Sequence, residues 1–376
     1  MTGPSGQNEL RIGLDLGGSK IEGILMGPGA TELARYRVAT PRNDYAATIA
    51  AIVDLTARLK QGITAGAKIG VGVPGSISPL TGLMQNANST WLNGRSFHRD
   101  LAVALATPVR LANDANCFAL SEAIDGAAEN ARIVFGVILG TGCGGGLVVN
   151  GRLLDGPRGI GGEWGHNPLP WTTPDEYPGP HCWCGRKGCL ETWVSGPGMA
   201  ADHARVTGET HTAAEIAARA KCGNVAARAT LSRHADRLAR GLAHVVNIID
   251  PDVLVLGGGL SQLSHLYERL PQLMGPHIFA DRGSVVIKAP KWGDASGIRG
   301  AARLWGFTPQ LIHRRCRLGS LFSGRIGLRV TQCAACFAPR VPFSRFRQGV
   351  CPLYRSRRAL VQSWHQPRAE RFVAKR

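Results

Sequence analysis

The sequence predicts an α/β protein built from two similar domains with a cleft between them. A strand, a glycine turn and a returning strand are expected at residues 10–26, and the same arrangement recurs at residues 133–149. The chain of 376 residues is also 44% hydrophobic, which is enough for two or three compact cores. Each repeat would then present its glycine turn to one ligand held between the domains.

The first domain is expected at residues 10–118. Its opening residues alternate apolar and other side chains, turn at two glycines and return, which is typical of a β-hairpin. Apolar residues at helical spacing follow, and then a buried strand ends at a Pro-Gly pair. The expected elements are a hairpin of 11–16 and 21–26 that turns at Gly17 and Gly18, a helix around 49–59, and a strand of 68–73 before Pro74 and Gly75.

The second and larger domain is expected at residues 119–294. A buried strand leads through a glycine turn to a returning strand, and a long amphipathic helix precedes another buried strand. A last helix at about 295–307 is expected to complete the first domain. The elements are strand 133–139, turn 140–146, strand 147–149, helix 225–249 and strand 253–256, which Gly257, Gly258 and Gly259 interrupt.

The positive charge of the chain is concentrated at its C-terminal end. The formal net charge is +18, but residues 311–376 hold fourteen Arg and one Lys against the single acid Glu370, so only +4 belongs to residues 1–310. This segment also holds four of the ten Cys and has no sustained apolar period. We expect the tail 310–376 to be disordered, or to derive from a shifted reading frame or read-through after about Thr308.

The alternative is a native basic tail that binds nucleic acid or an anionic membrane, with an affinity that vanishes as salt is added. Such tails are usually rich in Lys, whereas this one is rich in Arg, and nucleic acid is therefore not an expected partner. Cys333 and Cys336 lack partners at a recognisable second spacing, which favours a chance pairing over a metal or redox site. No stretch approaches the roughly 20 apolar residues of a membrane span, and Met1–Glu9 lacks a secretory pattern. We expect a cytoplasmic protein.

Asp114 is the candidate general base. It follows Asn113 at the end of a predicted strand and precedes a predicted helix, and side chains at such junctions face clefts in α/β proteins. A carboxylate there could accept the proton of a hydroxyl that attacks a phosphoryl group. The alternative is that Asp114 is an ordinary helix N-cap.

The glycine segments are candidate phosphate sites. Asp15 at the end of the first strand could hold Mg²⁺ through water, while Gly17, Gly18, Ser19 and Lys20 offer donors to phosphate. Gly140, Thr141 and Gly142 would form the opposing turn, and the run Gly257, Gly258 and Gly259 a third. Each cluster alone could be an ordinary glycine turn. The ordered set predicts a nucleotide-dependent sugar kinase.

Three thiols on a tight knuckle predict a metal site. Cys182, Cys184 and Cys189 are interrupted by glycines and suit a tetrahedral Zn²⁺ if one more ligand approaches. The fourth ligand is either His166 or His181; the latter is adjacent to Cys182, which strains chelation. Glu163, His166 and Glu191 flank the knuckle, so a structural zinc would anchor a loop that reaches sugar hydroxyls. Ordinary surface Glu residues are the alternative for the two acids, and Cys117, Cys143 and Cys222 are expected to be plain small hydrophobes.

Over residues 10–307 these motifs resemble the ROK family (repressors, uncharacterised reading frames and sugar kinases). The segments that carry the resemblance are 14–20, 111–116, 140–146 and 182–191, with Ser19 where the family usually has Thr. The resemblance implies an actin- and hexokinase-like (ribonuclease H-like) two-domain fold, ATP with Mg²⁺ and frequently a homodimer. It implies Asp114 as base, Asn113, Glu163, His166 and Glu191 on the sugar, with Gly75 beside them, and His166 as the fourth zinc ligand.

Within that family, Asn86–Gly94 and Gly162–Trp171 look most like bacterial fructokinases of the manno(fructo)kinase type. Fructose is therefore the expected substrate and fructose 6-phosphate the expected product. Mannose, glucose and N-acetylglucosamine remain alternatives, because all these sugars share the hydroxyls that such a site contacts. A non-catalytic, sugar-sensing ROK regulator is the rival of another class, but it would place a helix-turn-helix domain before the first strand, and only nine residues precede Leu10.

Overall fold

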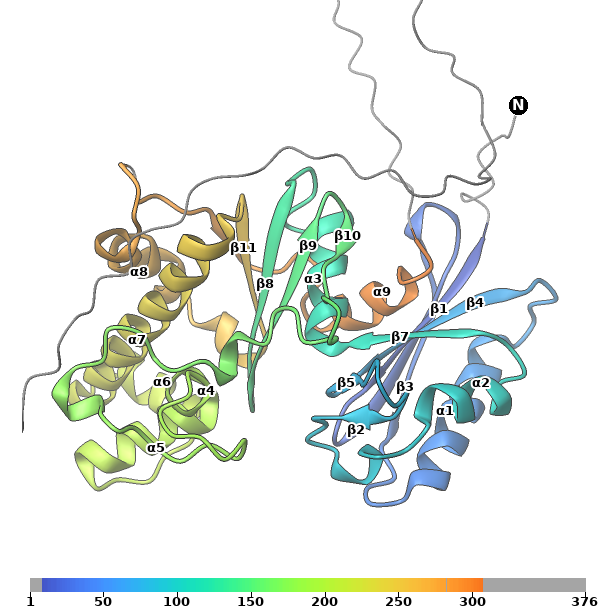
Figure 1. The fold of residues 1–376 in the computed structure, drawn as a ribbon, viewed down its shortest axis with the longest axis horizontal. Coiled ribbons are helices and arrows are strands. Elements are labelled where there is room, and N and C mark those ends of the chain that lie inside the picture. Colours follow the sequence, from blue (N-terminus) through green and yellow to red (C-terminus); the bar gives the residue numbers. More distant parts are fainter. Residues whose placement is uncertain (1–8, 282, 307–376) are drawn as a thin grey trace, which may run out of the picture. The chain divides into compact units, whose positions relative to one another are not determined.

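The computed structural model describes residues 9–281 and 283–306. Within this part of the chain lie two five-stranded sheets and one two-stranded sheet (Figure 1). The predicted tail 310–376 lies outside the described residues. None of the described helices combines the length and the apolar character that crossing a bilayer requires.

The first sheet has the strand order β3-β2-β1-β4-β7. The hairpin of β1 and β2 is antiparallel, β2 and β3 are antiparallel, and β4 and β7 run parallel to β1. The predicted hairpin is thus confirmed, and the sequence analysis missed β3. The strands are β1 (Leu10–Leu16), β2 (Lys20–Met26), β3 (Glu32–Ala39), β4 (Ala67–Val73) and β7 (Val109–Asn113).

Two helices and a small hairpin accompany this sheet: α1 (Tyr45–Leu59), α2 (Phe97–Ala104), β5 (Ser76–Ile77) and β6 (Met84–Gln85). Helix α1 begins after Asp44, whose side chain accepts a hydrogen bond from the Ala47 amide at 2.9 Å. Its face at Ile52 and Leu55 is completely buried against the sheet core, which explains the helical spacing of apolar residues in the sequence.

The second sheet has the order β10-β9-β8-β11-β12, with an antiparallel side and a parallel side like those of the first. The predicted repeat is therefore confirmed at the level of strand order. The expected turn 140–146 is too long, because β9 already begins at Cys143. A Cβ on Gly146 would lie 2.6 Å from the Ala115 carbonyl oxygen, so these glycines belong to a strand on which a helix packs closely. The strands are β8 (Ile133–Leu139), β9 (Cys143–Val149), β10 (Arg152–Leu153), β11 (Val253–Gly257) and β12 (Ile287–Lys288).

The helices of this second part are α4 (Glu191–Val194), α5 (Gly196–Thr207), α6 (Ala213–Lys221), α7 (Val225–Ile249) and α8 (His265–Met274). The predicted long helix coincides with α7, which begins after the N-cap Asn224 and ends where Asp250 adopts a left-handed conformation. The sequence analysis missed α5, α6 and α8. Short 3₁₀-helices complete the described chain: η1 (Pro28–Ala30), η2 (Thr90–Leu92), η3 (Trp164–His166), η4 (Pro174–Glu176), η5 (Gly259–Gln262), η6 (Gly275–His277) and η7 (Gly293–Ala295).

Helices α3 (Asp114–Ile124) and α9 (Ser296–Ala302) pack on each other and on both sheets (Figure 1). Helix α9 contacts β1, β2 and β4, and α3 contacts strands of either sheet. Gly13, Gly70 and Gly300 permit this approach, because a Cβ at each would collide with helix backbone. Since α3 contacts both sheets, the domain boundary at residue 118 remains a prediction.

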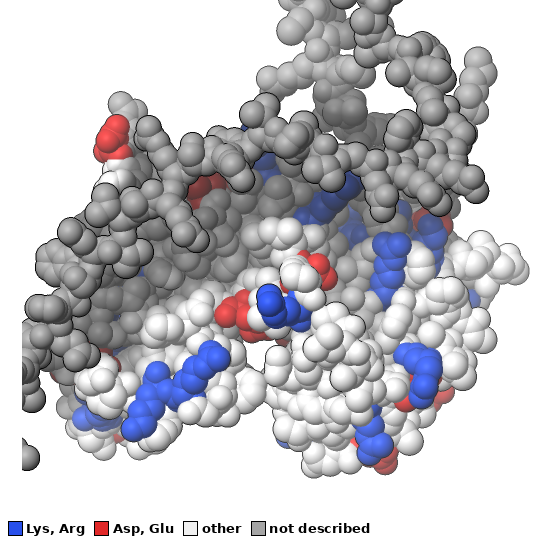
Figure 2. Space-filling model, in the orientation of Figure 1, with Lys and Arg blue, Asp and Glu red and all other residues white. Residues whose placement is uncertain are grey.

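On the described part of the face in Figure 2, Lys and Arg side chains form separate groups and not one continuous basic patch. This agrees with the small net charge of +4 that the sequence assigns to residues 1–310. Continuous basic surfaces are the electrostatic signature of nucleic-acid binding.

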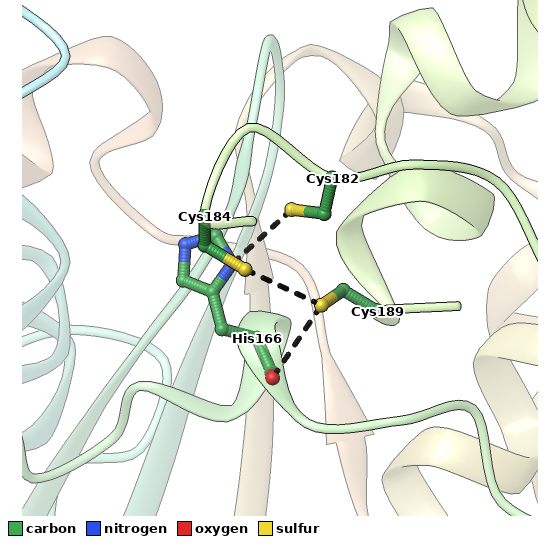
Figure 3. Close-up of side chains that lie close together, drawn as sticks. All are labelled: His166, Cys182, Cys184 and Cys189. Atoms are coloured by element: carbon green, nitrogen blue, oxygen red, sulfur yellow. Dashed lines mark hydrogen bonds between the residues drawn. The ribbon is translucent and has the colours of Figure 1, made fainter. Parts of the chain in front are cut away.

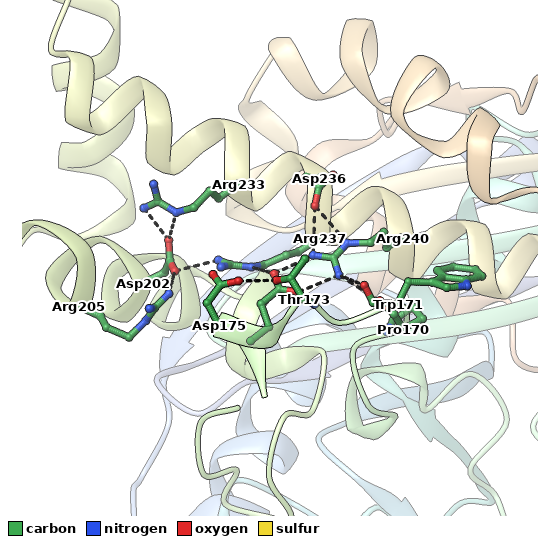
Figure 4. Close-up of polar contacts among 11 residues, drawn as sticks. Pro170, Trp171, Thr173, Asp175, Asp202, Arg205, Arg233, Asp236, Arg237 and Arg240 are labelled. Carbon is green, nitrogen blue, oxygen red and sulfur yellow. Dashed lines mark hydrogen bonds and ion pairs between the residues drawn. The ribbon is translucent and has the colours of Figure 1, made fainter. Parts of the chain in front are cut away.

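A buried ionic network ties the loop after η3 to α5 and α7. Figure 4 shows Asp202 of α5 among Arg205, Arg233 and Arg237, with distances of 2.6, 2.8 and 2.9 Å to their guanidinium nitrogens. Arg240 donates to the backbone oxygens of Pro170 and Trp171 at 3.1 and 2.8 Å. The loop that joins His166 to Glu191, two candidate sugar residues, is therefore held at Pro170 and Trp171 by a buried guanidinium group.

Candidate active site

Asp114 stands at the junction of β7 and α3. The N-cap of α3 is Asn113, whose Oδ1 accepts from the Ala115 amide at 2.9 Å, while its Nδ2 donates to the Gly75 oxygen at 3.2 Å. The alternative that Asp114 is the N-cap is therefore wrong, because its neighbour performs that role. Asp114 Oδ1 also accepts from the Ala115 amide, at 2.8 Å. Asp114 is the first residue of α3, and it lines the adjoining cleft.

This cleft has a volume of about 300 Å³ and takes its walls from the ends of β4, β7, β8 and β9 and from the loop around η3. It brings together nine residues that the sequence analysis selected: Gly75, Asn113, Asp114, Gly140, Thr141, Gly142, Glu163, His166 and Glu191. The sequence analysis did not select three other lining residues with polar or aromatic side chains: Asn86, Asn88 and Trp183. Asn86 and Asn88 belonged to a noted motif, so a signal for them existed.

Burial is the main reason why the pKa values of Asp114, Glu163 and Asp15 are raised. Burial raises the pKa of Asp114 despite its backbone hydrogen bonds. Burial also raises the pKa of Glu163, and the charges of Asp114 and Glu191 act in the same direction against the opposing effect of His166. Burial and then the charges of Asp114 and Glu22 raise the pKa of Asp15 to about 7. Carboxylates held in this way favour a bound proton or a cation.

A second pocket of about 560 Å³ adjoins the first and shares Gly140 and Thr141 with it. Its other walls come from the start of α5, the start of α6 and η5. Of the glycine run after β11, only Gly259 lines it. The lining residues are Gly140, Thr141, Gly196, Pro197, Ala200, Thr212, Ala213, Ala214, Ala217, Gly259, Leu260 and Leu263. Most of these are small residues on helices that the sequence analysis missed.

Several predicted phosphate residues lie outside the walls of these two pockets. Gly17 donates from its amide to the Lys20 oxygen at 3.0 Å in the turn between β1 and β2, and Lys20 forms an ion pair with Glu22 at 3.4 Å. Gly18 and Ser19 lie in the same turn and, like Asp15, do not line either pocket. Gly257 ends β11, and Gly258, with a φ of 77°, packs against the Leu139 backbone.

The predicted metal residues converge, as Figure 3 shows. One ligand atom from each of His166, Cys182, Cys184 and Cys189 lies within 4.8 Å of every other. Cys182 Sγ is 3.6 Å from His166 Nδ1, and the sulfurs of Cys184 and Cys189 are 3.6 Å apart. Tetrahedral zinc with bonds of about 2.3 Å to sulfur separates its ligand atoms by roughly 3.5–3.8 Å. The donor set therefore fits Zn²⁺.

The structure distinguishes the two histidines that the sequence left as alternatives. His181 forms an antiparallel bridge with Lys187 and does not join the cluster, whereas His166 reaches it from the end of η3. Burial and the two neighbouring thiols raise the pKa of the Cys189 thiol to about 12. Three thiols this close together can all ionise near neutral pH only if a cation compensates their charge.

The knuckle is linked to the cleft through Glu191. Its Oε1 accepts from Trp183 Nε1 at 2.7 Å, and its Oε2 accepts from the Cys143 amide at 2.9 Å. Trp183 lies between Cys182 and Cys184 in sequence, and its side chain is 64% exposed. Its hydrogen bond thus connects the knuckle to a carboxylate that lines the cleft.

A profile of the ROK family matches residues 11–307. An N-acetyl-D-glucosamine kinase from Haemophilus influenzae (strain 86-028NP) is 39% identical over 298 residues, covering 78% of this chain and 98% of that protein. One from Yersinia enterocolitica (serotype O:8 / biotype 1B) is 37% identical over 296 residues, with 78% and 98% covered. The solved ROK hexokinase from Thermus thermophilus has 30% identity and a TM-score of 0.69, covering 78% of this chain and 96% of that one.

A solved ROK family glucokinase from Streptomyces griseus, in complex with glucose and AMPPNP, has 25% identity and a TM-score of 0.65, with 78% and 98% covered. The chain therefore belongs to the ROK family. The predicted actin- and hexokinase-like two-domain fold and the predicted sugar kinase class are confirmed. The expected fructokinase type finds no support among these relatives, whose names specify another sugar.

Proposed function

We propose that this protein transfers a phosphoryl group from ATP to N-acetyl-D-glucosamine. The observation that carries the proposal is that Gly140 and Thr141 line both pockets, so the two pockets adjoin at this turn. A nucleotide in the larger pocket would direct its terminal phosphate along this turn toward a sugar in the smaller one. The choice of sugar rests on the relatives at 37–39% identity, all named N-acetyl-D-glucosamine kinases, and replaces fructose as the first substrate.

Asp114 is the proposed general base. Its carboxylate lines the sugar pocket, and its raised pKa suits a group that must hold the proton of a sugar hydroxyl as that oxygen attacks phosphorus. The hydrogen bond from Asn113 Nδ2 to the Gly75 oxygen connects the segment before Asp114 to the segment that follows β4. Such pre-positioning lowers the barrier because the reacting oxygen and its base are already oriented.

The phosphate chain is proposed to lie on the backbone of Gly140, Thr141 and Gly142, which line the pocket, with the Thr141 hydroxyl as a further donor. Mg²⁺ bound to ATP would neutralise charge on the phosphates. Asp15 interacts electrostatically with Asp114, and its pKa is raised to about 7. We propose that its carboxylate would hold this cation through water. The turn of Gly17, Gly18, Ser19 and Lys20 is proposed to meet the phosphates when the cleft closes.

Glu163, His166, Glu191, Asn113 and Gly75 are the proposed sugar contacts. Glu163 and Glu191 would accept hydrogen bonds from sugar hydroxyls, and a carboxylate acceptor makes such bonds stronger than a neutral one does. The cysteine cluster with His166 is proposed to hold a structural Zn²⁺ that orients Glu191 through Trp183. A structural ion supplies folding energy to this loop and takes no part in the chemistry.

The test is the Asp114→Asn variant, which keeps the shape of the side chain and removes the proton acceptor. We expect its turnover to fall by a factor of about 10²–10⁴, while the sugar Kd measured by calorimetry stays within about threefold of the original. Asp54→Asn, an exposed aspartate of α1, is the matched control and should retain full activity. Turnover of Asp114→Asn above a tenth of the original would remove Asp114 as the base.

A further inference from the structure

A second cluster of metal-binding side chains lies away from the cysteines, where α5 turns into α6. One ligand atom from each of His203, Glu209 and His211 lies within 4.8 Å of the other two. His203 belongs to the last turns of α5, and Gly208 ends that helix in a left-handed conformation with a φ of 77°. This turn sends the chain back over the helix, and it brings Glu209 and His211 onto His203.

Thr230 in α7 is the hydrogen-bond partner of His203 Nδ1, at 2.8 Å. The Thr230 hydroxyl is also 3.1 Å from the Ala226 oxygen, to which it can donate, and it accepts from Arg233 Nη2 at 3.1 Å. With the hydroxyl proton on the Ala226 oxygen, the remaining lone pair accepts from His203. We therefore assign to His203 the neutral tautomer that is protonated at Nδ1.

His203 Nε2 is therefore a lone-pair acceptor, and it has no hydrogen-bond partner among the described residues. The side chain is completely buried, with a relative exposure of 0%. A buried polar atom without a partner destabilises the fold, and a bound ion would satisfy it. An imidazole whose Nδ1–H is held by a neighbouring oxygen, and whose Nε2 is left without a partner, is the usual form of a metal-ligating histidine.

The other two ligands can adjust to an ion. The side chains of Glu209 and His211 are 52% and 23% exposed, and their Oε2 and Nε2 atoms are 3.1 Å apart. Arg219 of α6 also donates to Glu209 Oε2, at 3.0 Å, so the described contacts of this carboxylate leave Oε1 for a cation. Ligand atoms on one tetrahedral zinc are about 3.3 Å apart for nitrogen and oxygen donors. The Glu209–His211 pair at 3.1 Å already has this spacing, and all three ligand atoms lie within 4.8 Å of one another.

We propose that His203, Glu209 and His211 form a binding site for a divalent transition-metal ion such as Zn²⁺. Two imidazoles and a carboxylate are a common ligand set for zinc and leave the fourth position to water. The ion would connect the end of α5 to the loop before α6. The starts of both helices line the 560 Å³ pocket, so the ion would stabilise one wall of that pocket.

The experiment is the zinc content of the full chain after dialysis against buffered Zn²⁺, measured by elemental analysis. His211→Gln and Glu209→Gln should each hold one zinc per chain less than the unmodified protein, whatever the cysteine residues bind. His244→Gln, a change at an exposed histidine of α7, is the matched control and should hold the full amount. Equal zinc contents in His211→Gln, Glu209→Gln and the unmodified chain would overturn the proposal.

Nitrogen NMR of the histidine side chains provides a second measurement that does not depend on any variant. Without added zinc, His203 should give the signals of the neutral tautomer protonated at Nδ1. Addition of Zn²⁺ should shift the Nε2 resonance of His203 and a ring nitrogen of His211, and it should leave His244 unchanged. A His203 resonance that does not move at saturating zinc would refute the site.

Discussion

Replacement of Glu176 by Gln should destabilise the protein by about 3 kcal/mol. The side chain of Glu176 is 5% exposed, and its two oxygens accept from Arg237 Nε at 2.8 Å, from Arg240 at 2.7 and 2.9 Å, and from the Thr173 amide at 3.1 Å. Gln preserves the volume but removes the charge, which leaves two buried guanidinium groups with a neutral partner. Removal of one member of a buried pair typically costs about 3–5 kcal/mol.

The pKa of Glu176 gives the same magnitude independently. Burial alone would raise it, but the hydrogen bonds and charges of Arg240 and Arg237 lower it from 4.5 to about 2. Each unit of this difference corresponds to about 1.4 kcal/mol, so the ionised form stabilises the fold by about 3 kcal/mol near pH 7. Because the folded pKa is the lower one, this stabilisation is complete above about pH 4.5 and is lost as the pH falls through about 2.

Urea unfolding followed by fluorescence, together with thermal melting, measures the effect. At pH 7 we expect Glu176→Gln to lose about 3 kcal/mol, or about 5–10 °C in Tm, and the difference from the original protein should shrink below pH 4. Glu268→Gln on the exposed surface of α8 is the control and should change stability by less than about 0.5 kcal/mol. A loss below about 1 kcal/mol for Glu176→Gln would refute the reasoning.

Two further predictions concern the metal knuckle and the buried acid. Cys184→Ser should lower the zinc content by one ion per chain and reduce Tm. Cys222→Ser changes an exposed cysteine outside the cluster and should do neither. An unchanged zinc content in Cys184→Ser would exclude the cysteine site. Asp15→Asn should raise Tm in the absence of nucleotide and metal, because the folded pKa of about 7 lies above the ordinary 3.8 and ionisation opposes folding. The gain should grow from about pH 4 to about pH 7 and then level off, and a gain that is independent of pH would contradict this assignment.

The sequence predicted those helices and strands in which one buried face makes apolar residues recur at regular spacing. Helix α7 was predicted at its observed bounds because its broad apolar face is a local signal. The hairpin at Gly17 and the strand β8 were predicted for the same reason. Strand β9 was placed too late, because Cys143–Gly146 suggested a turn although the glycines serve close packing against α3.

The site was predictable where one short segment carries several of its residues. Asn113 with Asp114, the turn at Thr141 and the knuckle from Cys182 to Cys189 are of this kind. The larger pocket was not predictable, because its walls come from the separate helices α5 and α6 and from η5, and their small residues have no chemical signature. The sugar was not predictable either, since hexoses share the hydroxyls that these side chains contact.

A competition assay tests the central claim most directly. The full chain would receive limiting ATP with Mg²⁺ and equal concentrations of N-acetyl-D-glucosamine, glucose, mannose and fructose, and the phosphorylated products would be separated and identified by mass and by phosphorus NMR. Products of such a mixture form in the ratio of the kcat/KM values. We predict that N-acetyl-D-glucosamine phosphate is the main product. A main product of fructose phosphate would restore the fructokinase assignment, and the absence of any sugar phosphate from folded protein would contradict the kinase itself.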